Sequence, residues 1–249
     1  MKTLPYLREI SLKSDEIENW DLFPFTIRAI KNLVSLKFSP TVTFIIGENG
    51  SGKSTLLEAI AIAMGFNPEG GSKNFHFSTR ESHSNLHQFL KLVKAFQRPK
   101  DGFFLRAESF FNVASNIEQL DTGAGGAPII SSYGGVSLHE QSHGESFLSL
   151  ILHRFSGNGL YILDEPEAAL SPIRQLTVLA RMNQLLEQES QFIIATHSPI
   201  LMAYPGALIY HITESGIEAI DYEETEHYKI TKTFLENPKR MLNELFRGD

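Results

Sequence analysis

A single octapeptide indicates how this chain folds: Gly47-Glu48-Asn49-Gly50-Ser51-Gly52-Lys53-Ser54. It fits the pattern G-x-x-x-x-G-K-[ST] at every defined position. The apolar run at 42–46 precedes it and suits a strand that is buried on both faces. After it, apolar residues recur at helical spacing over 53–64. The order of strand, glycine-rich turn and helix predicts a phosphate-binding loop; the alternative is a chance glycine-rich turn between the two elements.

The composition of this loop suits the phosphates of a nucleotide. Glycines allow backbone N–H groups to turn inward, and the helix that follows directs the positive end of its dipole to the same place. Lys53 would place a positive charge on the β- and γ-phosphates, and the Ser54 hydroxyl would bind Mg²⁺. Thr55 is the expected contact of the α-phosphate. We therefore expect ATP and Mg²⁺ as ligands.

Two carboxylates, Asp164 and Glu165, follow the apolar run at 160–163. Because a buried strand cannot carry charges inside, we expect them at its carboxyl end, where ligands bind in parallel sheets. Adjacent strand residues point to opposite sides. Asp164 would then support Mg²⁺, while Glu165 would face the γ-phosphate and deprotonate the attacking water. Taken alone, such a pair is usually an ordinary turn or helix cap.

A further apolar run, at 191–195, closes on His197. One helix, at about 172–189, fills the interval after Glu165, so the two strands would be neighbours or near-neighbours. His197 could then hydrogen-bond the γ-phosphate or the attacking water. The alternative for a lone histidine at a strand end is a structural role.

Ser142 and Glu145 have the spacing of a capping box at a helix N-terminus. This structural role is sufficient by itself. The functional alternative is that the helix N–H groups and the Ser142 hydroxyl bind a phosphate. That phosphate would lie in the chain's own site or in the site of a second copy.

Periodicity and turn residues predict the remaining elements, and the alternation of strands with helices indicates an α/β fold with a largely parallel sheet. The expected segments are extended runs over 4–12 and 23–36, helices over 86–96, 145–155 and 238–246, a strand over 102–105, a glycine-rich mobile loop over 121–135 and a hairpin over 207–220.

In this order, these motifs resemble those of the ABC-type ATPases. The resemblance is to their cytosolic branch, the heads of chromosome-maintenance and recombination-repair ATPases and small stand-alone ATPases. It implies an α/β P-loop fold with a mostly parallel central sheet flanked by helices, an N-terminal antiparallel β-layer and a helical signature subdomain. One domain is expected over 1–249, with a helical and loop insertion at about 66–145. The resemblance also implies ATP hydrolysis within a head-to-tail homodimer that closes on two ATP molecules.

The resemblance also suggests more distant site residues. The family signature LSGGQ or LSGGE corresponds here to Gln141-Ser142-His143-Gly144-Glu145. This segment keeps Ser142, Gly144 and Glu145, which are the expected nucleotide contacts from a second copy. Glu108 is expected in place of the family's Q-loop glutamine, near the metal, and Gln97 is the weaker candidate. Adenine is expected to stack on Phe25, with a core position as the general alternative for a phenylalanine.

Composition limits the classes of function. The 249 residues carry a net charge of −7, so tight, non-specific nucleic-acid binding is a poor default unless a local basic patch exists. With no cysteine, the chain can form neither a disulfide nor a zinc–thiolate site. No signal peptide and no apolar run of membrane-spanning length is visible, so a cytoplasmic protein without direct membrane insertion is expected.

Several functions stay open. The first is an ATPase whose ATP-driven dimerisation acts on an unknown partner. The second is the nucleotide-binding subunit of an ABC transporter, which the lack of an evident Q-loop opposes. The third is a nucleic-acid-processing head, as in DNA repair, which the negative charge and the missing coiled coil oppose. A nucleotide sensor without turnover is a fourth.

Overall fold

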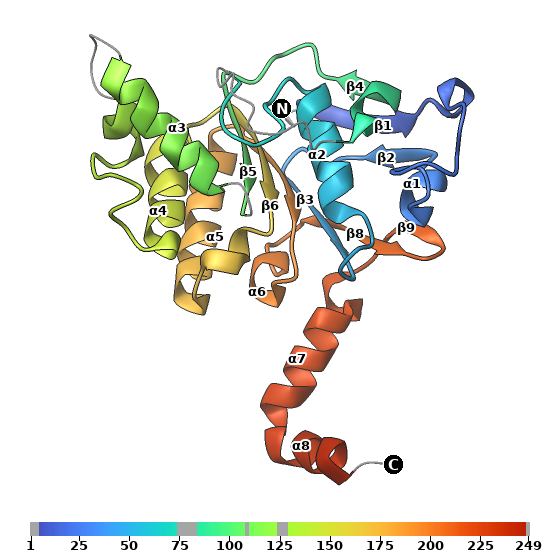
Figure 1. Cartoon of the computed structure of the whole chain (residues 1–249). Helices are drawn as coiled ribbons and strands as arrows, with labels where there is room; N and C mark the ends of the chain where they lie inside the picture. Colours follow the sequence, from blue (N-terminus) through green and yellow to red (C-terminus); the bar gives the residue numbers. More distant parts are fainter. Residues whose placement is uncertain (1–4, 74–83, 108–109, 124–128, 248–249) are drawn as a thin grey trace.

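The computed structural model describes residues 5–73, 84–107, 110–123 and 129–247. Its main feature is a six-stranded sheet that is parallel except at one edge (Figure 1). The antiparallel edge pair is the hairpin of the last two strands, as predicted. In spatial order the strands are β5 (Asp101–Arg106), β6 (Gly159–Asp164), β7 (Gln191–Ala195), β3 (Val42–Gly47), β8 (Leu208–Thr213) and β9 (Gly216–Ala219).

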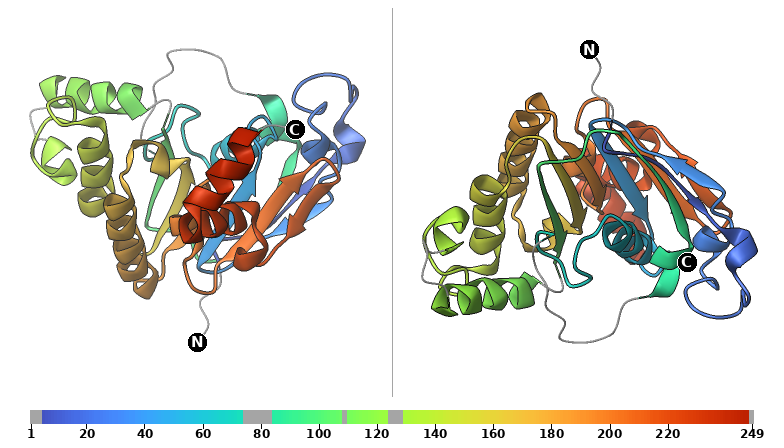
Figure 2. Two further views of the ribbon diagram at one scale, coloured as in Figure 1. Left: turned by 90° about the horizontal axis from the view of Figure 1, so that it is seen from below. Right: turned by 90° about the horizontal axis from the view of Figure 1, so that it is seen from above.

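Apolar cores lie on both faces of this sheet. Along β3, Phe44 and Ile46 belong to one core while Ile45 belongs to the other, because successive strand residues point to opposite faces. One face is covered by α2 (Lys53–Ala63) and the N-terminal sheet. Figures 1 and 2 show the other face covered by α3 (Phe110–Gly123), α4 (His143–Ser149) and α5 (Pro172–Glu187). The continuous apolar runs of the central strands are thus buried on both sides.

A second, antiparallel sheet forms the expected N-terminal layer. Its order is β2 (Ser35–Lys37), β1 (Leu7–Leu12) and β4 (Leu90–Lys94). The prediction of a helix over 86–96 is wrong, because residues Asn85–Phe89 form a 3₁₀ helix and the chain then pairs with β1. The apolar spacing there fits a helix locally, but pairing with β1 decides the conformation. Within the expected extended segment at 23–36, residues Arg28–Lys31 instead form the short helix α1.

The helical subdomain between the P-loop and β6 was predicted only in part. Helix α4 begins two residues before the expected segment at 145–155 and continues as a π-helical turn over Leu150–Arg154. Helix α3 was not predicted. The glycine-rich segment at 121–135 ends in a 3₁₀ helix over Ile129–Tyr133, and residues 124–128 lie outside the described part of the chain.

The C-terminal residues form an arm that projects from the body of the molecule (Figure 1). A short helix, α6 (Pro199–Met202), follows β7, and the arm comes after β9 and consists of α7 (Glu226–Glu236) and α8 (Pro238–Arg247). The helix predicted over 238–246 is confirmed as α8, whereas α7 was not predicted. None of the residues of α7 or α8 is buried. Among the described residues, no helix is both long and apolar enough to cross a membrane.

Candidate active site

The phosphate loop connects β3 to α2, as predicted. At Gly47 the backbone φ is 154°, and a Cβ would lie 2.7 Å from the Ile212 carbonyl oxygen. At Gly52 φ is 102°, and a Cβ would lie 2.8 Å from Cγ2 of Ile27. Both positions therefore require glycine, for backbone conformation and for space. The loop can wrap closely because these two residues carry no side chain.

Lys53 is folded back into the loop. Its side chain is buried, and Nζ donates to the carbonyl oxygens of Gly47 and Glu48, at 2.9 Å each. Burial lowers the pKa of Lys53, and the nearby carboxylates of Glu165 and Asp164 oppose that shift. The loop carbonyls and these carboxylates thus hold the ammonium at the centre of the site.

Asp164 lies at the carboxyl end of β6, beside the first turn of α2. The Ser54 hydroxyl donates to Asp164 Oδ1 at 3.1 Å. Arg106, at the end of the neighbouring strand β5, places Nε 3.7 Å from Asp164 Oδ2. The same guanidinium pairs at 2.6 Å with Glu58, a buried carboxylate of α2. Neither Arg106 nor Glu58 was predicted from the sequence. The one signal for Arg106 is that this cation ends an apolar strand.

Glu165 lies just beyond the end of strand β6. β6 ends at Asp164, and Glu165 has a left-handed backbone, with φ 51° and ψ 53°. The two acids therefore separate by this turn of the backbone and not by strand alternation, which corrects the reason expected from the sequence. The Glu165 amide donates to the Ala195 carbonyl at 2.9 Å, which ties the turn to β7. The Glu165 side chain is 40% exposed.

His197 lies beside Glu165, because β6 and β7 are adjacent and parallel, with Asp164 opposite Ala195. The predicted neighbouring of the two strands is confirmed. His197 Nε2 is 3.7 Å from Glu165 Oε1. The His197 amide donates to Glu167 Oε1 at 2.5 Å. Glu167 was missed in the sequence, since nothing distinguishes it from an ordinary helix-start acid.

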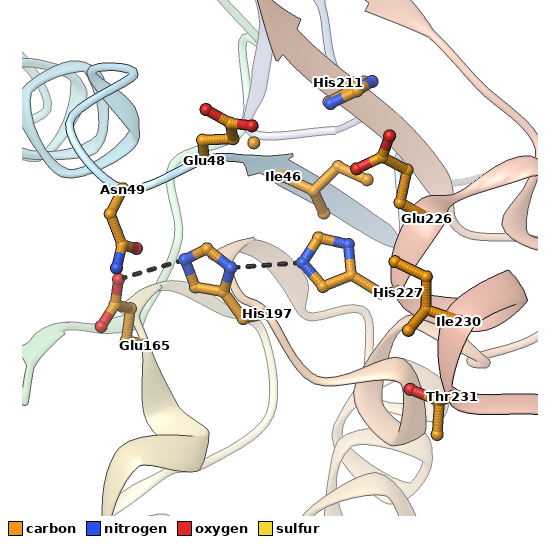
Figure 3. A pocket seen from close by; sticks show the side chains of 11 residues that line it. Ile46, Glu48, Asn49, Glu165, His197, His211, Glu226, His227, Ile230 and Thr231 are labelled. Carbon is orange, nitrogen blue, oxygen red and sulfur yellow. Dashed lines mark hydrogen bonds and ion pairs between the residues drawn. The ribbon is translucent and has the colours of Figure 1, made fainter. Parts of the chain in front are cut away.

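Cavities open on both sides of Glu165. One, of about 470 Å³, is lined by Lys53, Ser54 and Thr55, together with Phe23 and Ile27. The other, of about 740 Å³, is lined by Gly47, Glu48 and His197, and by α7 residues that include His227 (Figure 3). Asn49 and Glu165 border both cavities. The loop, the strand-end acid and the histidine thus line two cavities that share Asn49 and Glu165.

Comparisons with known proteins agree with this geometry. An AAA-domain family profile matches residues 16–127, and a second AAA-domain profile matches residues 129–203. The description of the second names the AbiEii toxin of a type IV toxin–antitoxin system. The chain is a P-loop ATPase.

Relatives of this P-loop ATPase are ABC-type nucleotide-binding proteins. It is 28% identical over 191 residues to an uncharacterized ABC transporter ATP-binding protein of Haemophilus influenzae, covering 65% of this chain and 66% of that protein. It is 27% identical over 194 residues to the energy-coupling factor transporter ATP-binding protein EcfA1 of Fusobacterium nucleatum subsp. nucleatum, covering 74% of this chain and 73% of that protein.

A solved structure shares the fold of the ATPase. An ABC transporter of metal-chelate type, in an inward-facing conformation, aligns with a TM-score of 0.51 and 14% identity. The alignment covers 93% of this chain and 88% of that chain. The expected ABC-ATPase-like architecture is therefore confirmed.

The expected adenine contact, Phe25, does not fit the structure of the ATPase. Phe25 is only 4% exposed and packs edge-on against Trp20 and Phe89 in the core. It presents no free ring face, so the structural alternative is correct. Phe23, two residues earlier, is 63% exposed and lines the same cavity as Lys53. The sequence held no signal that separates these two phenylalanines.

The Q-loop candidates have no support in the described structure of the ATPase. Glu108, the proposed metal neighbour, lies outside the described residues. Gln97 is exposed and precedes β5, so it lies near the strand end opposite Arg106 and away from the phosphate loop.

The signature segment forms the capping box at the start of α4. Glu145 Oε2 accepts from the Ser142 amide at 3.1 Å and from its hydroxyl at 2.5 Å, and Glu145 Oε1 pairs with Arg174 at 3.2 Å. Hydrogen bonds from Ser142 lower the pKa of the Glu145 carboxyl. Gly144 is closely packed, because a Cβ there would collide with the Ala169 carbonyl. Figure 1 shows α4 and α2 on opposite faces of the central sheet.

Proposed function

We propose that this ATPase hydrolyses ATP with Mg²⁺ in a site that a second copy of the chain completes. The observation that carries the proposal is the convergence of four side chains at the carboxyl ends of the central strands: Lys53, Asp164, Glu165 and His197. In the proposed mechanism, Lys53 and the loop N–H groups bind the β- and γ-phosphates. Glu165 accepts a proton from the attacking water, and His197 hydrogen-bonds the γ-phosphate.

The metal would be held by Ser54 and Asp164. A hydroxyl and a carboxylate are the hard oxygen ligands that Mg²⁺ prefers, and their 3.1 Å contact supports the proposal that both bind one ion. Mg²⁺ usually takes one or two protein carboxylates together with substrate phosphates. When bound, Mg²⁺ would neutralise the charge that develops on the phosphates.

Phe23 is the proposed adenine contact in place of Phe25. Replacement of Phe23 by Ala is expected to weaken ATP binding by about 5-fold or more, since base–aromatic stacking contributes about 1–3 kcal/mol. Its effect on stability should stay within about 0.5 kcal/mol, because the ring is exposed. Replacement of Phe25 by Ala should instead lower the free energy of unfolding by about 3–5 kcal/mol.

Isothermal titration calorimetry with ATP and urea unfolding of both variants measure these effects. The assignment of Phe23 is contradicted if its Ala variant binds ATP as tightly as the unaltered protein.

The second copy is proposed to supply Ser142, Gly144 and Glu145. We propose a head-to-tail pair because α4 lies across the sheet from the chain's own phosphate loop. Complementation tests this arrangement. Lys53→Ala and Ser142→Ala proteins are each expected to lose about 10²-fold or more in turnover, as when a transition-state donor is removed.

Mixing the two inactive proteins should restore activity, because one of the two sites in the mixed dimer has both an intact Lys53 and an intact Ser142. At equal amounts, the mixture should recover about a quarter of the original rate. A mixture as inactive as its components would show that the signature segment does not act across a dimer.

The transporter function keeps specific support from the relatives, two of which are named as transporter ATP-binding proteins. Under this second proposal, the chain would energise a membrane-embedded subunit from its cytoplasmic side. Affinity purification of the chain from detergent-solubilised membranes tests it. Recovery of a multi-span membrane protein would favour the transporter, whereas nucleic-acid stimulation of the ATPase at several salt concentrations would favour a DNA-associated role.

A further inference from the structure

A second imidazole lies against His197, and it comes from the C-terminal arm. His227, in the first turn of α7, places Nε2 3.2 Å from His197 Nδ1. The ring centroids are 5.4 Å apart, with an angle of 49° between the planes. Figure 3 shows His197 between Glu165 on one side and His227 on the other. Each nitrogen of His197 therefore faces a different neighbour.

The contacts of His197 determine which of its two ring nitrogens carries the proton. Nε2 is buried 3.7 Å from Glu165 Oε1 and has no hydrogen-bond partner in the described part of the chain, so it must be the N–H in order to donate to that carboxylate or to a γ-phosphate oxygen. In the neutral imidazole, Nδ1 is then an acceptor. The only nitrogen that His227 offers to it is Nε2, which must therefore be the donor of their hydrogen bond.

The surroundings of His227 favour its neutral form. Burial lowers its pKa, followed by the electrostatic effects of His197 and His211, while Glu226 opposes the shift. A neutral imidazole carries a single N–H, and placing it on Nε2 leaves Nδ1 without a proton. Nδ1 of His227 is buried and has no hydrogen-bond partner in the described part of the chain, so no second contact competes for the other tautomer.

A series of hydrogen bonds fixes His227 relative to His197. Thr225 is fully buried and caps α7, accepting from the Tyr228 amide at 3.2 Å and donating to the Tyr222 carbonyl at 2.8 Å. The Tyr222 hydroxyl in turn donates to the carbonyl of Pro199, two residues after His197, at 2.9 Å. The first turn of α7 is thereby attached to the segment that carries His197, although the rest of the arm is exposed.

We propose that His227 is a positioning residue, which donates its Nε2–H to His197 Nδ1 and so holds His197 in the tautomer whose Nε2–H faces the γ-phosphate. The inference rests on the proposed function for the role of His197. It adds that the reactive orientation of that residue depends on the C-terminal arm. Holding an imidazole in one tautomer is a known requirement for its work in catalysis.

The test compares three variants of the full chain: His227→Ala, His227→Gln and, as a matched control on the exposed side of α7, Lys229→Ala. His227→Ala removes the donor and should lower kcat about 10-fold, with KM for ATP unchanged, because the phosphate loop is untouched. Glutamine keeps an N–H donor and should restore most of kcat. Lys229→Ala should behave as the unaltered protein.

A second measurement reports the tautomer directly. In protein labelled with ¹⁵N-histidine, the ring nitrogen shifts of His197 distinguish the Nε2–H form from the Nδ1–H form, and a His197→Gln variant assigns its signals among the nine histidines. We expect the Nε2–H form in the unaltered protein and in His227→Gln, and a mixture of both forms in His227→Ala.

The proposal is overturned if His197 keeps its tautomer in His227→Ala, or if His227→Gln loses as much activity as His227→Ala. A separate result would identify a failure of the proposed function. If His197→Ala hydrolyses ATP at the normal rate, His197 does not contact the γ-phosphate, while the tautomer measurement still decides the role of His227.

Discussion

Replacement of Glu165 by Gln is expected to lower kcat for ATP hydrolysis by about 10²- to 10⁴-fold, the range for loss of a general base. The amide cannot accept a proton from water, although it fills the same space between the two cavities. ATP affinity should change little, because Lys53 and the loop N–H groups are unaffected. The backbone at this position should also keep its conformation, since Glu and Gln differ only at the end of the side chain.

Phosphate release in the presence of Mg²⁺ measures the change in kcat, with EDTA as the zero-turnover reference. In parallel, size-exclusion chromatography of Glu165→Gln with ATP should show a dimer that the unaltered protein forms only transiently. Glu187→Gln, an exposed change at the end of α5, is the matched control. Normal turnover by the Glu165 variant would show that Glu165 is not the general base and that another group deprotonates the attacking water.

Removal of the Lys53 ammonium should weaken the binding of ATP. The side chain is 4% exposed, and its Nζ lies within the loop that is proposed to hold the phosphates. Truncating one partner of a buried charge pair costs about 2–5 kcal/mol, so Lys53→Ala should bind ATP roughly 30-fold or more weakly. This loss differs from that of Glu165→Gln, which should bind ATP and not turn it over.

Titration with a fluorescent ATP analogue measures the affinity of Lys53→Ala, and far-ultraviolet circular dichroism checks that it is folded. Lys94→Ala serves as a control, since Lys94 is an exposed lysine that bonds the Ala63 carbonyl at the far end of α2. If Lys53→Ala is folded and binds the analogue with unchanged affinity, the phosphates do not bind in this loop.

The parts of the site that could be predicted are those that the chain carries in contiguous segments. Strand, loop and helix follow one another over 42–63, and the three glycines of this stretch with positive φ, Gly47, Gly50 and Gly52, all fall within the motif itself. Glu165 and His197 could be predicted because each ends an apolar strand, and parallel strands with one helix between them end at the same edge. Local pattern and topology are sufficient for these residues.

The parts that could not be predicted depend on contacts between distant segments. Residues 90–94 have apolar spacing that fits a helix, yet they form a strand because they pair with β1. Phe23 and Phe25 are equivalent in the sequence, and only the packing of Trp20 and Phe89 shows which of the two is buried.

The sequence by itself determined that this chain has a phosphate loop, strand-end acids and a histidine at one edge of an α/β sheet. Hydrophobic periodicity and the demands of the P-loop on backbone conformation are local properties, and they are written in consecutive residues. Only the tertiary structure decided that His227 of α7 meets His197. That contact joins residues 30 positions apart through the capped first turn of a helix, and its energy depends on burial and hydrogen-bond direction, which no local pattern encodes.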